Sequence, residues 1–254
     1  MEIESEVRDH VMRIRFNRPE KKNAITSVMY SALADALASA EADVAVRAVL
    51  ITGSAEAFTA GNDLEDFLKH PPLGLDAPVF RFLFGISQLS KPLVASVSGV
   101  AIGIGTTLLL HCDLVYAADN ARFALPFTPL GLVPEAASSL LLPRLAGYQR
   151  AAEKLLLGEV FDARAANELG LLTRVVPAAE LAGLIEAQLA RLVSLPAASL
   201  RVTKRLMKGA DTAAVRLRIE EEAVEFGHRL QGPEAKEAFT AFLEKHKPDF
   251  SQFS

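Results

Sequence analysis

The segment from residue 92 to residue 110 contains 19 consecutive residues without a charged side chain, close to the length of a membrane-spanning helix. A proline begins the segment, and Gly99, Gly103 and Gly105 interrupt it. Glycine weakens the interior of a helix, and the apolar run at 93–97 suits a buried strand. The segment therefore predicts a strand, a glycine-rich turn and a buried helix of a soluble protein.

Short strands alternate with helices through the first two thirds of the chain. Residues 11–16 alternate apolar and basic side chains, as a half-buried strand does, and residues 48–52 form an apolar run closed by a glycine. Residues 114–117 predict another buried strand. Thr26 or Ser27 can cap a helix whose apolar side chains recur at helical spacing. This alternation is typical of an α/β fold.

The last third of the chain changes to helical patterns. Helices are expected at residues 148–157, 162–169, 179–193, 198–207, 211–229 and 233–245. We divide the chain into an α/β core over residues 1–195 and a C-terminal helical region over residues 196–254. This boundary marks a change in composition.

The composition narrows the classes of partner and compartment. The 254 residues include 27 basic and 31 acidic side chains, mixed along the chain, and the net charge of −4 argues against nucleic acid or an anionic membrane as a partner. Cys112 is the single cysteine and, among apolar neighbours, is expected to be an inert buried thiol. The N-terminus lacks a signal-peptide pattern, so we expect a cytoplasmic protein.

Three segments carry residue types that suit chemistry. In the first, residues 58–64, small residues would let a ligand approach the backbone, and Gly61 permits dihedral angles that expose a neighbouring amide. The alternative is a polar loop in which Asp63 caps the following helix.

The second segment, residues 98–108, is a strand that runs into a glycine-rich turn and then a helix. Free N–H groups and the positive end of a helix together favour negative charge. Close packing of the helix on a sheet explains the glycines equally well. The pattern of a phosphate-binding P-loop is missing.

The third segment contains Glu135, an isolated carboxylate among small and apolar residues. Such surroundings can raise a pKa toward neutrality, which suits a group that takes and returns a proton. The alternative is a glutamate in the first turn of a helix that starts after Pro134. His111 is expected to have a structural role, and no histidine has metal-ligand spacing.

The order and spacing of these segments resemble the crotonase (enoyl-CoA hydratase/isomerase) family. Residues 58–64 resemble its first oxyanion loop and residues 99–105 its second. Residues 130–134, 161–163 and 170–172 match later landmarks, so the resemblance covers essentially the whole chain. It implies a crotonase-like ββα spiral core with a C-terminal helical region that takes part in trimerisation and covers an active site.

The resemblance also implies that an acyl-CoA thioester binds with its oxygen between the backbone N–H groups of Asn62 and Ile104. Each donor would contribute roughly 3 to 4 kcal/mol to the transition state, whatever its side chain. The implied contacts with substrate and coenzyme A are Lys22, Ala24, Ala60, Asn62, Asp63, Leu64, Ile104 and Phe127, with Lys21 also near the nucleotide. No metal or cofactor is implied beyond coenzyme A as the carrier of the substrate.

Hydratases of this family use two glutamates, and this chain has Thr107 and Phe127 at those positions. Glu135 instead falls where the subgroup that resembles peroxisomal-type Δ3,Δ2-enoyl-CoA isomerases carries its single carboxylate. The resemblance therefore implies an enzyme that shifts a 3-enoyl-CoA double bond to the 2-position, with Glu135 as acid and base. The alternatives are hydration of 2-enoyl-CoA, another enolate reaction such as rearrangement of a ring-containing thioester, or a non-catalytic acyl-CoA-binding scaffold.

The resemblance further implies a homotrimer or a dimer of trimers, with the C-terminal helices covering a neighbour's active site. Lys245 and Lys247 would then meet the phosphates of coenzyme A across the interface. The expected lining of the acyl pocket is apolar and consists of Phe80, Leu83, Phe84 and Phe127.

Overall fold

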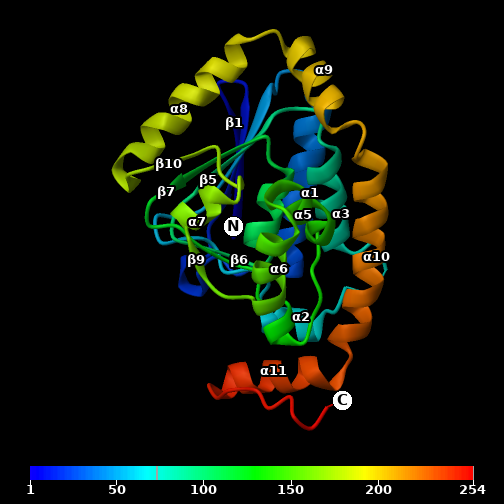
Figure 1. Cartoon of the computed structure of the whole chain (residues 1–254). Coiled ribbons are helices and arrows are strands. Elements are labelled where there is room, and N and C mark those ends of the chain that lie inside the picture. Colours follow the sequence, from blue (N-terminus) through cyan, green and yellow to red (C-terminus); the bar gives the residue numbers. More distant parts are fainter. Residues whose placement is uncertain (73, 254) are drawn as a thin grey trace.

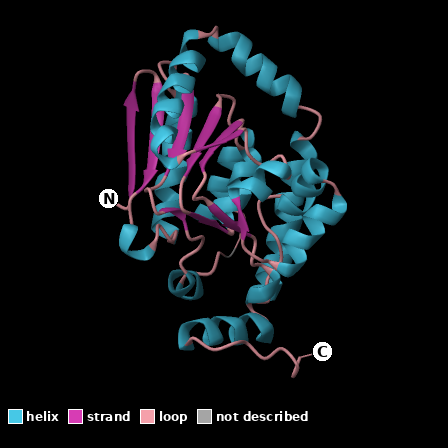
Figure 2. Ribbon diagram, turned by 60° about the vertical axis from the view of Figure 1, so that its left-hand side comes forward, coloured by secondary structure: helices cyan, strands magenta, loops and turns pink. Residues whose placement is uncertain are grey.

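The computed structural model describes residues 1–72 and 74–253, in which two sheets are surrounded by helices (Figures 1 and 2). The larger sheet has the strand order β1-β2-β3-β5-β7-β10. Its neighbouring strands are parallel except for the antiparallel pair β1 and β2. The strands are β1 (Ile3–Arg8), β2 (Val11–Phe16), β3 (Ala48–Thr52), β5 (Leu93–Val97), β7 (Leu114–Ala118) and β10 (Arg174–Val176).

The smaller sheet has the order β4-β6-β8-β9, and only its β8 and β9 pair is antiparallel. Its strands are β4 (Ala57–Thr59), β6 (Val100–Ile102), β8 (Arg122–Ala124) and β9 (Phe161–Asp162). The chain passes from the larger to the smaller sheet three times, from β3 to β4, from β5 to β6 and from β7 to β8. This repeated step confirms the predicted spiral α/β core.

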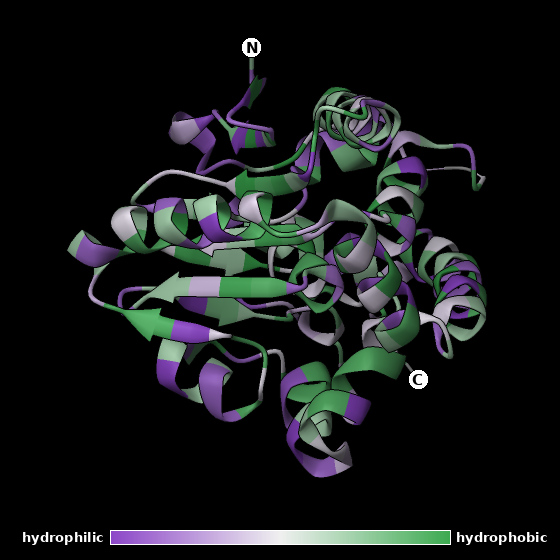
Figure 3. Cartoon of the chain, turned by 90° about the horizontal axis from the view of Figure 1, so that it is seen from above, coloured by the Kyte–Doolittle hydropathy of each residue, from purple (hydrophilic) through white to green (hydrophobic). Residues whose placement is uncertain are grey.

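Helices cover both faces of the larger sheet. On one face, α1 (Ser27–Ala42) and α3 (Pro78–Gln88) pack into the main hydrophobic core. On the other face, α8 (Ala178–Ser194) packs its buried leucines and isoleucine against β2, β3, β5 and β7. Strands covered on both faces are apolar on both faces, and Figure 3 shows hydrophobic colour along them.

The helices of the last third lie within one residue of their expected ends. They are α6 (Tyr148–Leu157), α7 (Ala163–Glu168), α8, α9 (Ala197–Lys208), α10 (Thr212–Leu230) and α11 (Pro233–Glu244). Helix α10 runs past α3, and α11 lies beyond α2 (Leu64–Lys69) at the end of the molecule (Figure 1). The division of the chain near residue 195 stays a prediction.

The uncharged segment from 92 to 110 forms several short elements. After β5 and β6 come α4 (Ile104–Thr107) and the 3₁₀ turn η2 (Leu108–His111), so the predicted buried helix is only a single turn followed by a tighter one. Among the described residues, no single helix has the length and apolar character to cross a membrane. Only α8 and α9 taken together pass that test, and they meet at a bend of 104°.

Candidate active site

The backbone at Asn62 is set by a parallel bridge to Ile25. The Ile25 N–H donates to the Gly61 carbonyl at 2.8 Å, and the Asp63 N–H donates to the Ile25 carbonyl at 2.9 Å. In a parallel pairing these bonds go to the two residues that flank Asn62, so the N–H of Asn62 is not consumed by the bridge. Gly61 has φ of +90°, and a Cβ there would lie 2.9 Å from the Ile102 carbonyl oxygen. Glycine thus allows this loop to approach β6 closely.

Ile104 is the first residue of α4. Its N-cap, Gly103, has φ of 56° and ψ of −119°, and the Gly103 carbonyl accepts from the N–H groups of Thr106 and Thr107. The first N–H groups of a helix have no acceptor within it, which leaves the Ile104 N–H available. A Cβ at Gly105 would lie 2.7 Å from Thr59 Cγ2, so α4 also packs closely on β4. The close packing expected from the glycines is therefore present, and the binding of negative charge at this turn stays a prediction.

Residues of both loops line a single cavity of about 440 Å³. Seven of the predicted contact residues line it, namely Ala24, Ala60, Asn62, Asp63, Leu64, Ile104 and Phe127. Lys22 does not, because it lies in the left-handed region at the end of a 3₁₀ turn and is exposed, and its neighbour Lys21 lines the cavity instead.

The wall opposite the loops comes from the C-terminal helices of the same chain. Phe226 of α10 and Phe239, Phe242 and Leu243 of α11 line the cavity. These helices therefore line a cavity of their own chain, and the expectation that they cover a neighbour's active site stays a prediction. The contacts of Lys245 and Lys247 with a neighbour's ligand stay a prediction.

A second, smaller cavity of about 20 Å³ joins Asn62 to Glu135. Asn62, Phe67 and Phe226 line both cavities, so the two are adjacent, and we call the smaller one, which Glu135 also lines, the inner cavity. The rest of its wall is apolar and includes Pro72, Val79, Phe80, Leu83, Ala136, Ile219 and Ala223.

Two of the residues expected in the acyl pocket do not line the smaller cavity, and the contact of either with an acyl chain stays a prediction. Phe84 is not part of the small cavity; the Arg216 guanidinium lies over its ring, 5.2 Å from the centroid. Phe127 lines the larger cavity instead.

Glu135 lies in a turn and not in a helix. Ala136 and Ala137 both adopt positive φ, at 59° and 57°, and α5 (Ser138–Ala146) begins only after them. The helix-start alternative is therefore wrong, because two left-handed residues cannot continue a right-handed helix.

The carboxyl of Glu135 has an altered acidity. Burial among apolar side chains raises the pKa of Glu135 from 4.5 to about 8. A hydrogen bond from the Thr107 hydroxyl, at 2.5 Å, opposes this rise, and the charge of Glu222 adds to it. A carboxyl that titrates near neutral pH is suited both to accept and to return a proton.

A family model described as enoyl-CoA hydratase/isomerase matches residues 6–253. The chain belongs to the enoyl-CoA hydratase/isomerase family. The family recognised in the sequence is thus confirmed, and the chain is an enzyme of this family.

Relatives from the enoyl-CoA hydratase/isomerase family match over nearly the whole chain. The chain is 36% identical over 259 residues to 1,2-epoxyphenylacetyl-CoA isomerase of Escherichia coli, covering 98% of each protein. It is 37% identical over 239 residues to enoyl-CoA delta isomerase 2 of Rattus norvegicus, covering 92% of this chain but only 61% of that longer protein. A crystal structure of enoyl-CoA hydratase/isomerase from Pseudoalteromonas atlantica superposes with a TM-score of 0.94 at 42% identity, over 98% of this chain and 100% of that one.

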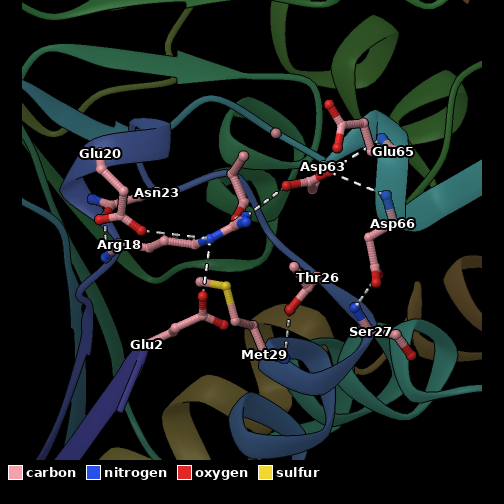
Figure 4. A network of polar contacts seen from close by, with 12 residues as sticks. Glu2, Arg18, Glu20, Asn23, Thr26, Ser27, Met29, Asp63, Glu65 and Asp66 are labelled. Atoms are coloured by element: carbon pink, nitrogen blue, oxygen red, sulfur yellow. Dashed lines mark hydrogen bonds and ion pairs between the residues drawn. The ribbon is translucent and has the colours of Figure 1, made fainter.

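The first loop of this enoyl-CoA hydratase/isomerase chain is held by Arg18 (Figure 4). The Arg18 guanidinium donates to Asp63 Oδ2 at 2.7 Å and to the Ala24 carbonyl at 2.9 Å, and it also pairs with Glu2. Burial favours the neutral form of Asp63, but the bonds from Arg18 and from the Asp66 amide outweigh it and lower the pKa of Asp63. Asp63 therefore stays ionised beside the backbone of Asn62.

Asp63 also begins α2, as the sequence suggested. Its Oδ1 accepts from the N–H groups of Glu65 and Asp66, both at 3.1 Å. The Asp66 carboxylate in turn accepts from the Ser27 N–H at 2.7 Å, at the start of α1 (Figure 4). The loop is thus tied to the N-termini of two helices.

Sequence reasoning missed the residues that hold Asn62 and Glu135 in place. The Tyr30 hydroxyl donates to Asn62 Oδ1 at 2.5 Å, so the Asn62 side chain does have a role. Burial, followed by the charge of Glu135, raises the pKa of Tyr30 well above 10, which keeps its proton in place. In the sequence, Tyr30 is only one member of the apolar stripe of a helix. Thr107 is notable there only because hydratases of the family have a glutamate at that position.

His111 has the structural role expected of it, whereas Cys112 is only partly buried and not the fully buried thiol that the sequence suggested. His111 is buried, its Nε2–H donates to the Ala136 carbonyl at 2.7 Å, and burial lowers its pKa to about 4. The ring is therefore neutral at physiological pH. Burial raises the pKa of the Cys112 thiol to about 12, so it is hardly ionised and a poor nucleophile.

Proposed function

We propose that this enzyme shifts the double bond of a 3-enoyl-CoA thioester to the 2-position. The observation that carries the proposal is that Glu135 is the only carboxylate among the described residues lining the inner cavity, where Asn62 also lies. Moving a double bond needs one group that takes a proton and returns it, and a single carboxyl can do both.

The proposed reaction has two proton transfers. The thioester oxygen accepts hydrogen bonds from the Asn62 and Ile104 N–H groups, which stabilise negative charge as it develops there. Ionised Glu135 removes a proton from C2, and the electrons of that C–H bond move through the carbonyl to form a dienolate. Glu135 then delivers the proton to C4 as the double bond forms between C2 and C3.

Hydration of a 2-enoyl-CoA is less well supported by these residues. It commonly needs one group to activate water and another to supply a proton. Thr107 uses its hydroxyl as a donor to Glu135, and Phe127 has no group that can accept a proton. A second candidate is rearrangement of a ring-containing thioester, which the similarity to 1,2-epoxyphenylacetyl-CoA isomerase favours. It would use the same two amides and the same carboxyl.

The test compares purified wild type and Glu135→Gln on 2-enoyl-, 3-enoyl- and ring-epoxide thioesters of coenzyme A. We expect the wild type to act fastest on the 3-enoyl substrate and the variant to lose about a hundred- to ten-thousand-fold in rate. Glu180→Gln, on the exposed side of α8, is the matched control and should keep full activity. Undiminished isomerisation by Glu135→Gln, or a wild type that hydrates faster than it isomerises, would overturn the proposal.

We further propose a homotrimer or a dimer of trimers as the assembly. The support is the family resemblance, together with the exposed apolar side chains of α6 and α9, among them Leu156, Leu157, Leu206 and Met207. Sedimentation equilibrium of the full chain measures the assembly, and a monomer at micromolar concentration would exclude it.

A further inference from the structure

The turn that presents Glu135 has an unfavourable backbone. Ala136 and Ala137 follow it in the left-handed region, although neither is glycine. Residues with a Cβ adopt that region only where surrounding contacts enforce it. Both alanines are buried, so water does not supply those contacts.

Glu222 of α10 accepts hydrogen bonds from one side of this turn. Its Oε2 accepts from the Ala137 N–H at 2.6 Å, and its Oε1 accepts from the Ser139 N–H at 3.0 Å and from the Ser139 hydroxyl at 2.5 Å. The Arg218 guanidinium, one turn earlier on α10, donates to the same hydroxyl at 3.1 Å. Glu222 is only 7% exposed, so these bonds have little competition from water.

His111 holds the same turn from another direction. Its Nε2–H donates to the carbonyl of Ala136, the residue directly after Glu135. The turn is therefore held at two consecutive residues. The Glu222 carboxylate accepts from the N–H of Ala137, and the His111 imidazole donates to the carbonyl of Ala136. Charge-assisted bonds of the kind that Glu222 makes are the stronger ones.

We propose that Glu222 is a positioning residue, which fixes the Ala136–Ala137 turn and so places the Glu135 carboxyl beside the reacting carbons. This inference rests on the proposed function for the identity of the reaction. The geometric part of the inference does not rest on the proposed function, because the three bonds to Glu222 are independent of any substrate.

The position of Glu222 on α10 has a second consequence. Ile219, Ala223 and Phe226 of the same helix line the inner cavity that contains Glu135. One helix therefore both lines the cavity beside Glu135 and holds the turn that carries it. A displaced α10 moves that wall and the turn together.

The test uses Glu222→Ala, with Glu225→Ala as the matched control, because Glu225 is an exposed glutamate on the same helix. The first measurement is amide hydrogen exchange of residues 133–142. We expect at least tenfold faster exchange of the Ala137 and Ser139 amides in Glu222→Ala and no change in Glu225→Ala. Unchanged exchange in a folded Glu222→Ala would overturn the proposal, whatever reaction the enzyme catalyses.

The second measurement is steady-state kinetics on a 3-enoyl-CoA. A misplaced base slows the chemical step more than it weakens binding, so we expect kcat to fall about ten- to a hundredfold with KM changed less than threefold. In a Glu135→Gln background the same substitution should cause no further fall, because there is no base left to misplace. An equal fall in both backgrounds would show that Glu222 acts elsewhere.

If Glu222→Ala does not fold, Glu222→Gln replaces it in the test. The glutamine amide keeps one acceptor oxygen, but its NH₂ group faces the donors that the other carboxylate oxygen had bound. We then expect faster exchange at Ala137 or at Ser139 but not at both, and unchanged exchange at both would overturn the proposal. If the wild type shows no isomerisation, the proposed function fails while the exchange experiment still decides the role of Glu222 in the turn.

Discussion

The Thr107 hydroxyl donates a hydrogen bond of 2.5 Å to Oε1 of Glu135, across 28 residues of sequence. Thr107 occupies one of the two positions at which hydratases of the family carry a glutamate. The structure instead makes it a partner of the remaining carboxylate. A bond to the ionised form favours that form, so Thr107 lowers the pKa of Glu135 against the burial that raises it.

Thr107→Val keeps the shape of the side chain and removes the hydroxyl. Because the bond favours the carboxylate, its loss should raise the pKa of Glu135 above its value of about 8. We expect the acid limb of the kcat/KM profile against pH to move about one to two units to higher pH, as for a bond to a charged group. A limb that stays in place or moves to lower pH would contradict this assignment.

The raised pKa of Glu135 also predicts how stability depends on pH. Between its ordinary pKa of 4.5 and its folded value of about 8, the folded state holds a proton that the unfolded state has released. The free energy of unfolding therefore falls as pH rises through that range. Glu135→Gln lacks this titration, so its loss of stability between about pH 5 and about pH 8.5 should be smaller, by on the order of 4 kcal/mol at most. Denaturant titrations at both pH values measure the difference, and equal losses would refute it.

Arg18→Met should destabilise the loop that carries Asn62. It leaves the carboxylate of Asp63, which is 9% exposed, without its cation, and we expect a cost of about 3 kcal/mol in the free energy of unfolding. Arg15→Met is the matched control, because the ion pair of Arg15 with Glu4 is exposed and should contribute below about 1 kcal/mol. Equal effects of the two substitutions, measured by urea denaturation, would argue against a special role of Arg18.

Gly105→Ala should disturb the oxyanion site through packing alone. The added methyl would lie 2.7 Å from Thr59 Cγ2 and 2.9 Å from the Thr59 carbonyl, so the start of α4 must move and carry the Ile104 N–H with it. We expect about 1 to 3 kcal/mol of destabilisation and at least a tenfold loss in kcat, measured by denaturation and by isomerisation rate.

The matched control for that substitution is Gly183→Ala, in the exposed middle of α8, where a Cβ would meet no atom within 4 Å. Alanine suits a helix better than glycine, so this variant should gain about 0.5 to 1 kcal/mol and keep its activity. A Gly105→Ala enzyme that behaves like the control would show that α4 can shift without affecting catalysis.

Local patterns predicted most of the secondary structure. The alternation at 11–16, the apolar run at 48–52 and the helical spacing after 148 each became the expected element, because such periodicity reports which face of a segment is buried. The whole of β1 was missed, since its polar and acidic residues lie on an edge strand with one exposed face.

The sequence by itself indicated an α/β pattern, two glycine-containing loops and an isolated carboxylate, because these depend on residue types at short spacing, and its resemblance to the enoyl-CoA hydratase/isomerase family implied the spiral core. Only the tertiary structure decided that Thr107 bonds to Glu135 and that Tyr30 bonds to Asn62. It also decided that Glu222 holds the turn from a helix more than 80 residues away, and that α10 and α11 line a cavity of their own chain. The physical reason is that a buried carboxyl takes its pKa and its position from whatever packing brings beside it. No spacing along the chain encodes that neighbourhood.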